Sequence, residues 1–342
     1  SADGQNWGFP TYNWEKMAED GYAWWKARFA KMAEYFDVFR IDHILGFFRI
    51  WEIPYTAKSG LLGHFNPAMP LTTEEIAQWG ITFYPERHAT PFTPGDDTDV
   101  LFVEDPYQPG TYHPRINGFD TESFKALPEN ERKAFYALHD HFFYHRHNDF
   151  WYREAMKKLP ALIDATDMLV CGEDLGMIPA CVPTVMNELR ILSLEIQRMP
   201  KAFGCTFDNP AHYPYYSVCT TSTHDMSGIR GWWEEAPTLT QRYWSEMLHQ
   251  RGKAPQECEA WICEAIVRQH LDSPAMLTIL PLQDWMAIDE HLRYAGPHFE
   301  RINVPANPFN YWRYRMHLTL EELLQADDFN RQVRRLVAQS GR

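Results

Sequence analysis

The chain alternates between stretches with helical periodicity and short apolar stretches. Residues 15–36 carry large apolar side chains at steps of three and four positions, which predicts a helix with one apolar face. These side chains are Trp25, Phe29, Met32 and Phe36. Residues 37–42 follow as a short, mostly apolar segment that ends in charged side chains, which predicts a buried strand.

The same order of elements returns in the second half of the chain. Further strands are predicted at 168–173, 193–197, 216–221 and 275–280, and helices near 180–191 and 227–235, within 239–271 and within 318–340. Strands that alternate with helices are typical of an α/β fold, either a β/α barrel or an open doubly wound sheet. No glycine-rich phosphate-binding sequence follows any predicted strand, which disfavours a nucleotide-binding open sheet. We therefore expect a (β/α)8 TIM barrel.

The predicted strands do not complete such a barrel. A barrel of this kind needs eight strands, and the pattern yields five, so we expect the first strands to lie upstream of Ser1. Residues 55–160 interrupt the rhythm with turns rich in proline and glycine and then a helix-like stretch at about 129–158. We expect an insertion subdomain at 55–160 between barrel core at 1–54 and the remaining strands and helices at 161–342.

Composition and charge limit the partners of this protein. The formal charge of −14 opposes binding to nucleic acid and to anionic membranes, and no run of about 18 apolar residues is present. The 13 Trp and 17 Tyr residues include candidates for stacking against sugar rings. The six cysteines form no C-x-x-C pair and show no zinc spacing, which predicts buried free thiols in a reducing cytoplasm.

Charged residues end three of the predicted strands. Arg40 and Asp42 are two positions apart on one strand and therefore share a face, where the arginine would hold the aspartate ionised. Glu173 ends a second strand between small residues, where a partly desolvated carboxyl is suited to act as an acid. His224 and Asp225 follow a third strand and have the groups to hydrogen-bond a vicinal diol.

Each pair also has a purely structural alternative. Arg40 and Asp42 can form an ion pair at a strand end, and Glu173 can lie in a turn in which Asp174 caps the next helix. Asp225 can serve as a helix N-cap, for which aspartate is a favoured residue. The combination points to chemistry because three carboxylates converge on one barrel face, and two of them suffice for retaining glycoside chemistry.

The ordered motifs resemble the α-amylase clan and are most similar to glycoside hydrolase family 77, the 4-α-glucanotransferases. The segments that carry this resemblance are Gly4–Tyr12, Arg40–Gly46 with Trp51–Pro54, Cys171–Gly176, Thr223–Asp225, Pro281–Asp284, Arg301–Pro305 and Tyr311–Arg313. The resemblance implies Asp42 as nucleophile, Glu173 as general acid/base and Asp225 as transition-state stabiliser. It also implies a set of substrate-binding residues: Arg40, His43, His224, Trp7, Gln5, Asp174, Asn303 and Asp284.

The spacing of these motifs is unusual for the family. Asp42 and Glu173 are 131 positions apart, far more than in short family members. The segment that begins at Tyr112 and the run from Phe142 to Trp151 resemble the long-insert subgroup, which includes the plant cytosolic disproportionating enzyme and similar bacterial proteins. The resemblance implies maltooligosaccharides or α-glucan as substrate, and this chain as the C-terminal portion of such an enzyme.

Four histidines in the insertion raise the question of a metal. His139, His141, His145 and His147 lie close together, and His141 and His145 have helical i, i+4 spacing. No glutamate follows His141 to complete a zinc-protease motif. We favour an aromatic, partly buried helix face, and we expect neither metal nor cofactor.

Three competing hypotheses remain open at this stage. An α-amylase-like hydrolase shares the same carboxylates and differs only in the acceptor. The chain can also be an inactive glucan-binding fragment of the full-length enzyme, and an incomplete barrel with exposed strand edges would favour self-association to complete it. A zinc hydrolase that uses the histidine cluster is the third.

Overall fold

The computed structural model describes residues 6–55, 57, 59–90, 99–307 and 309–342. The chain divides into two compact units, each described by itself. Unit 1 contains residues 1–170 and 177–189, and unit 2 contains residues 171–176 and 190–342. The predicted insertion at 55–160 therefore lies wholly within unit 1.

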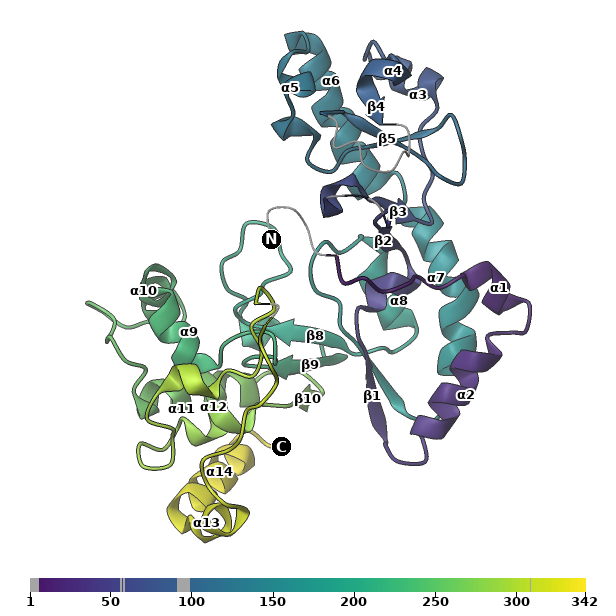
Figure 1. Ribbon diagram of the computed structural model, residues 1–342. Coiled ribbons are helices and arrows are strands. Elements are labelled where there is room, and N and C mark those ends of the chain that lie inside the picture. The colour runs from purple at the N-terminus through teal and green to yellow at the C-terminus, as the bar shows by residue number, and fades with distance from the viewer. Residues whose placement is uncertain (1–5, 56, 58, 91–98, 308) are drawn as a thin grey trace. The chain divides into compact units, whose positions relative to one another are not determined.

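Unit 1 contains short strands and most of the longer helices of the first half of the chain (Figure 1). Its helices are α1 (Trp14–Ala18), α2 (Ala23–Met32), α3 (Thr73–Gln78), α4 (Pro85–His88), α5 (Glu122–Lys125), α6 (Glu129–Asp140), α7 (Asn148–Ile163) and α8 (Cys181–Glu188). Its strands are β1 (Val38–Ile41), β2 (Ile50–Glu52), β3 (His64–Asn66), β4 (Ala89–Thr90), β5 (Phe102–Glu104) and β6 (Tyr112–Pro114). Strands β2 and β3 pair antiparallel, and β4, β5 and β6 form a separate sheet.

The predicted helix over 15–36 is two helices rather than one. Gly21 and Tyr22 both adopt the left-handed backbone conformation, with φ of 69° and 63°, which ends one helix and starts the next. The apolar side chains predicted to face the core do so in part, since Trp25 and Phe29 are buried. The helix-like stretch at 129–158 is likewise divided, into α6 and α7, by a π-helical turn at His141–His145.

Strand β7 (Leu169–Gly172) begins in unit 1 and ends in unit 2. In unit 1 it pairs with β1, where the Leu169 amide donates to the Asp37 carbonyl over 2.9 Å. In unit 2 its last residues run parallel to the chain at the start of β8, and the Gly172 amide donates to the Leu192 carbonyl over 2.8 Å.

Unit 2 is built around a parallel sheet in the order β8 (Ser193–Ile196), β9 (Ser217–Thr220), β10 (Leu277–Thr278), whose strands lie side by side in Figure 1. Its helices are α9 (Ile229–Glu235), α10 (Pro237–Glu246), α11 (Ala260–Leu271), α12 (Leu282–Met286), α13 (Leu320–Gln325) and α14 (Asp327–Gln339).

All five predicted strands exist, at or within the predicted boundaries, as β1, β7, β8, β9 and β10. Sheets of the described residues have two or three strands, and none of them closes into a barrel.

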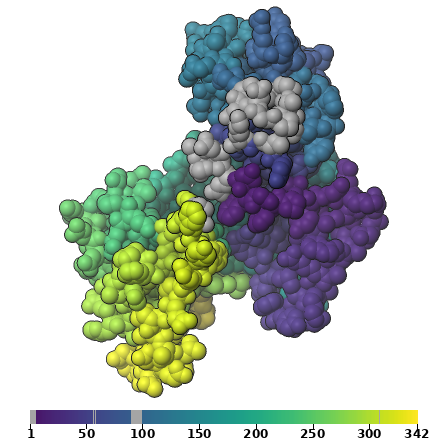
Figure 2. All heavy atoms as spheres, viewed as in Figure 1, coloured from purple at the N-terminus to yellow at the C-terminus, as the bar shows by residue number. Residues whose placement is uncertain are grey.

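A continuous apolar core fills unit 2 beside the sheet. Its members include buried side chains from α9, α10, α11 and α12, among them Trp233, Tyr243, Ile262 and Met286. The two C-terminal helices lie on the surface of this unit (yellow in Figure 2), and α14 turns Phe329 and Leu336 into the core. The helical structure predicted within 318–340 is thus confirmed, as two helices.

Candidate active site

Strand β1, which precedes the candidate nucleophile Asp42, shows strict alternation of buried and exposed residues. Phe39 and Ile41 are buried, whereas Arg40 and Asp42 lie on the other face. The Arg40 guanidinium donates to Asp42 Oδ1 over 2.5 Å, and the Asp42 side chain is 82% exposed. The prediction that these two residues share a face is confirmed, and most of the Asp42 side chain is exposed to solvent.

The backbone turns sharply after Asp42. His43 adopts a left-handed conformation with φ of 45°, which is uncommon for a residue other than glycine and is often found at functional sites. The following residues 44–47 form a 3-10 helix whose Ile44, Leu45 and Phe47 are buried. These anchors fix the end of the strand and leave His43 at the surface.

The opening motif contributes one described candidate. Trp7 is 63% exposed, and Gln5 lies outside the described residues. Further along this segment the Thr11 hydroxyl donates to Glu52 Oε1 over 2.7 Å. Glu52 also accepts from Asn66 and from the Tyr107 hydroxyl, so this carboxylate connects the opening segment to β3 and to the insertion.

Glu173 directly follows β7 and belongs to unit 2. Its side chain is partly buried, as predicted for a carboxyl at the end of an apolar strand. Glu173 Oε1 accepts the Leu175 amide over 2.9 Å, so the turn after the strand holds this carboxylate in place.

Asp174, the next residue, is buried and occupied by protein donors. Its Oδ1 accepts the Leu194 amide over 2.9 Å, and its Oδ2 accepts the Lys201 ammonium over 2.8 Å. Burial raises the pKa of Asp174, although Lys201 opposes this effect. The alternative in which Asp174 caps the next helix is wrong, because α8 begins after Ala180. These contacts favour a role in holding the start of β8.

Asp225 lies in the loop after β9 and is half-exposed. The alternative of a helix N-cap is wrong for this residue, because α9 begins at Ile229 with Gly228 at the N-cap. Asn303 donates from Nδ2 to Asp225 Oδ1 over 2.7 Å, and His224 Nε2 lies 3.3 Å from Asp225 Oδ2. Unit 2 thus brings together three residues that the sequence predicted as site residues: His224, Asp225 and Asn303.

Asp284 holds this loop from beneath. It is 2% exposed, and its Oδ2 accepts the hydroxyls of Thr221 and Ser222 over 2.5 and 2.8 Å. Its Oδ1 accepts the Ile229 amide over 2.8 Å, the first backbone donor of α9. One carboxylate therefore hydrogen-bonds both ends of residues 221–229. Asp284 is buried, whereas Asp225 in the same loop is half-exposed.

Arg198 is a second support of the same loop, and the sequence reasoning missed it. It donates from Nη2 to the carbonyls of Thr221 and Ser227 over 2.8 and 2.9 Å, and its guanidinium lies over the Trp232 ring. Burial lowers the pKa of Arg198, while the nearby Asp284 carboxylate raises it. The sequence contained one indication of this role, because Arg198 is a charged residue two positions after the end of β8. The carboxyl ends of parallel strands share one edge of the sheet, so Arg198 could be expected near the loop after β9.

The insertion histidines form aromatic contacts. His147 is buried, stacks on Trp151 with ring centroids 4.6 Å apart, and bonds the Phe142 carbonyl. His139 is also buried and bonds the Ile116 carbonyl over 3.0 Å. Within the described ranges, no group of three or more His, Cys, Asp or Glu side chains is arranged to hold a metal ion.

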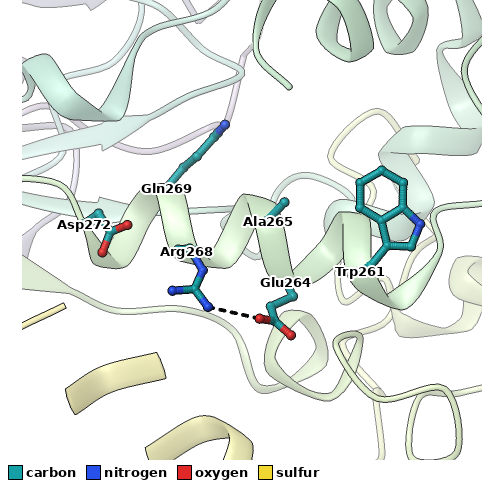
Figure 3. Close-up of a pocket in the computed structure, with 6 residues that line it drawn as sticks. All are labelled: Trp261, Glu264, Ala265, Arg268, Gln269 and Asp272. Atoms are coloured by element: carbon teal, nitrogen blue, oxygen red, sulfur yellow. Dashed lines mark hydrogen bonds and ion pairs between the residues drawn. The ribbon is translucent and has the colours of Figure 1, made fainter. Parts of the chain in front are cut away.

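A shallow hollow of about 360 Å³ lies along α11 in unit 2 (Figure 3). Its lining residues are Trp261, Glu264, Ala265, Arg268, Gln269 and Asp272. Figure 3 shows the ion pair between Arg268 and Glu264 along the helix. The hollow shares no residue with the candidate active site.

In the part of the chain that is described, no helix has the length and apolar character needed to cross a membrane.

Comparison with solved structures gives the class of fold. The chain is similar to the amylomaltase of Streptococcus agalactiae in complex with acarbose, with a TM-score of 0.59 and 19% identity, over 99% of this chain and 48% of that one. It is also similar to the amylomaltase of Corynebacterium glutamicum, with a TM-score of 0.53 and 16% identity, over 99% and 40%. The fold is therefore of the amylomaltase type.

Comparison of sequences gives the family. Residues 1–320 match the model of glycoside hydrolase family 77, described as 4-alpha-glucanotransferase, and the chain belongs to this family. It is 36% identical to the 4-alpha-glucanotransferase DPE2 of Oryza sativa subsp. japonica, over 99% of this chain and 43% of the relative. It is 24% identical to the 4-alpha-glucanotransferase of Chlamydia pneumoniae, over 98% and 48%. The chain spans about half the length of these relatives, and the resemblance stated from the motifs is confirmed.

Proposed function

We propose that this protein is a 4-α-glucanotransferase that moves α-1,4-glucan segments between maltooligosaccharides. The observation that carries the proposal is the family match, which spans all three candidate carboxylates: Asp42, Glu173 and Asp225. The relatives named 4-alpha-glucanotransferase align with nearly the whole chain and support the same activity.

The proposed chemistry is a double displacement with retention of configuration. Glu173 donates its proton to the glycosidic oxygen as the bond to the leaving glucan breaks, and an Asp42 oxygen forms an ester with the anomeric carbon. Glu173 then takes the proton of an incoming sugar 4-hydroxyl, whose oxygen displaces Asp42 and closes a new α-1,4 bond. The exposed carboxylate of Asp42, beside the Arg40 guanidinium, is consistent with the role of nucleophile.

Asp225 is proposed to stabilise the transition state. Its half-exposed carboxylate, with Asn303 and His224 on its two oxygens, is suited to accept hydrogen bonds from the hydroxyls of the reacting sugar. Arg40, His43, His224, Trp7 and Gln5 are proposed to contact substrate, and Asn303 is proposed to support Asp225, to which its buried amide donates. Asp174 and Asp284 are proposed to act indirectly, because both are buried and accept hydrogen bonds from the protein.

Finer features of the proposal concern the whole protein. We propose a (β/α)8 barrel of the α-amylase clan as the complete fold, since solved amylomaltases share the fold of this chain. The proposed location is the cytoplasm, and self-association that completes the barrel is proposed for this chain when it is alone. No cofactor enters the proposed mechanism.

The test is product analysis with maltotriose. The transferase should release glucose together with oligosaccharides longer than maltotriose, whereas an α-amylase-like hydrolase should give only shorter sugars. The variant Asp42→Asn should lose turnover and the covalent intermediate. Near-wild-type turnover of this variant would contradict the assignment of the nucleophile, and hydrolysis alone would contradict transfer.

A further inference from the structure

Residues 303–312 of unit 2 form two separate contacts with the loop that carries the third carboxylate. Asn303 is 8% exposed and bonds Asp225 through its Nδ2, over 2.7 Å. Trp312, at the other end of the segment, lies with its ring 4.8 Å from the ring of His224. The geometry of this segment therefore bears directly on His224 and Asp225.

The amide of Asn303 has two ends, and each has its own partner. An asparagine amide offers a carbonyl oxygen that accepts and an NH₂ group that donates, and a turn of 180° exchanges them. Asn310 donates from Nδ2 to Asn303 Oδ1 over 3.0 Å and to the Ile302 carbonyl over 3.4 Å. Because Asn310 presents a donor, the oxygen of Asn303 must face it, and the NH₂ group of Asn303 must then face Asp225.

We propose that Asn310 is a positioning residue that fixes the orientation of the Asn303 amide, so that Asn303 presents a donor to Asp225. This inference rests on the proposed function of Asp225 in catalysis. Without the donor of Asn310, Asp225 alone holds the Asn303 amide in this orientation, and an acceptor at position 310 would draw the amide toward the opposite one, with its oxygen against the Asp225 carboxylate. Two oxygens in that position repel each other and displace Asp225 from the place it needs in the transition state.

Two variants separate this role from simple support of the segment. Asn310→Ala and Asn310→Asp both remove the hydrogen bonds to Asn303 and to the Ile302 carbonyl. Only Asn310→Asp adds an acceptor opposite Asn303 Oδ1 and so drives the amide into the wrong orientation. Asn307→Asp is the matched control: it adds the same charge in the same segment, and it retains an oxygen to accept the Phe309 amide, as Asn307 Oδ1 does over 3.0 Å.

The experiment measures kcat and KM for glucose release from maltotriose, with thermal unfolding to confirm that each variant is folded. We expect kcat to fall about 10-fold in Asn310→Ala, which corresponds to the loss of about one hydrogen bond, and about 100-fold in Asn310→Asp, while KM changes little. Asn307→Asp should retain the wild-type kcat.

The contrary outcomes are equally specific. Equal kcat values in the two Asn310 variants, whether reduced or unchanged, would overturn the orienting role, since both variants lose the same hydrogen bonds. A change in KM with an unchanged kcat would also overturn it. If the wild-type chain makes no oligosaccharide longer than maltotriose, the proposed function fails, and this result is distinct from an active wild type with insensitive variants.

Discussion

The carboxylate of Asp284 is expected to be the most sensitive single group beneath the candidate active site. The substitution Asp284→Ala leaves three donors without their acceptor: the hydroxyls of Thr221 and Ser222 and the amide of Ile229. The site is 2% exposed at Asp284, so bulk water does not replace the lost oxygen atoms. Arg198, whose pKa is lowered by burial, also loses the largest compensating negative charge beside it.

The magnitude follows from these contacts. A hydrogen bond to a charged group contributes about 1.5–3 kcal/mol, which gives an upper limit of about 9 kcal/mol for three such bonds. The two hydroxyls can rotate toward other acceptors, whereas the Ile229 amide has a fixed direction. We therefore expect Asp284→Ala to cost about 3–5 kcal/mol, similar to the removal of one partner from a buried ion pair. Asp284→Asn retains one acceptor oxygen and should cost about 2 kcal/mol.

The assay is urea unfolding followed by circular dichroism, with maltotriose turnover measured on the folded variants. Asp289→Asn serves as the control, because Asp289 Oδ1 also accepts backbone amides, from His291 and Leu292, and asparagine retains that ability. Asp284→Asn should lower kcat more than it raises KM, since a buried carboxylate acts on substrate only through the loop of Asp225. A loss below about 1 kcal/mol in Asp284→Ala would refute the reasoning.

Three further substitutions test the surroundings of the site. In Gly228→Ala the new Cβ would lie 2.8 Å from Asp284 Oδ1, so unfolding experiments should show a loss of about 1–3 kcal/mol. Burial raises the pKa of Glu300 to about 7 from its ordinary value of 4.5. The folded state therefore binds this proton more tightly than the unfolded state does. The free energy of unfolding should fall by up to about 3 kcal/mol as pH rises from below the ordinary pKa of Glu300 to above its raised pKa. Urea titrations at a series of pH values should show that Glu300→Gln removes this dependence. Lys201→Met should cost about 3 kcal/mol at pH 7, because buried Asp174 loses its cation, and the loss should shrink at lower pH as Asp174 takes up a proton; an unchanged urea midpoint at pH 7 would contradict this.

Much of the fold of unit 2 was accessible from local pattern. Each predicted strand is a run of apolar residues flanked by helical sequence, and such runs are distinctive even without knowledge of their partners. The divided helix at 15–36 was not predicted, because the apolar positions that indicate it, from Trp25 to Phe36, all follow Gly21 and Tyr22 and carry no information on the break there. Periodicity indicates which side chains share a face of a helix. It does not indicate where a change in backbone conformation ends one helix and starts the next.

Local strand geometry also predicts part of the candidate site. Arg40 and Asp42 are two positions apart on a strand, so their common face follows from strand geometry alone. Glu173 and Asp174 are adjacent, and adjacent residues after a strand tend to face opposite ways. That reasoning was available from the sequence and separates a partly buried Glu173 from a buried Asp174 that meets Lys201. Resemblance to a family motif does not make this distinction, since it transfers both residues together.

Asp284 shows what neither local geometry nor motif resemblance could supply. Its partners Thr221 and Ser222 lie more than 60 positions earlier in the chain, and Ile229 lies 55 positions earlier. The sequence marks Asp284 as a carboxylate within a family motif, which is equally consistent with contact to a sugar hydroxyl or to a protein hydroxyl. Only burial separates the two, because a carboxylate that is 2% exposed and accepts three protein donors has no free edge to offer a substrate. The same argument applies to Asn310, whose importance depends on which end of the Asn303 amide faces Asp225, a property of orientation that no pattern of residue types records.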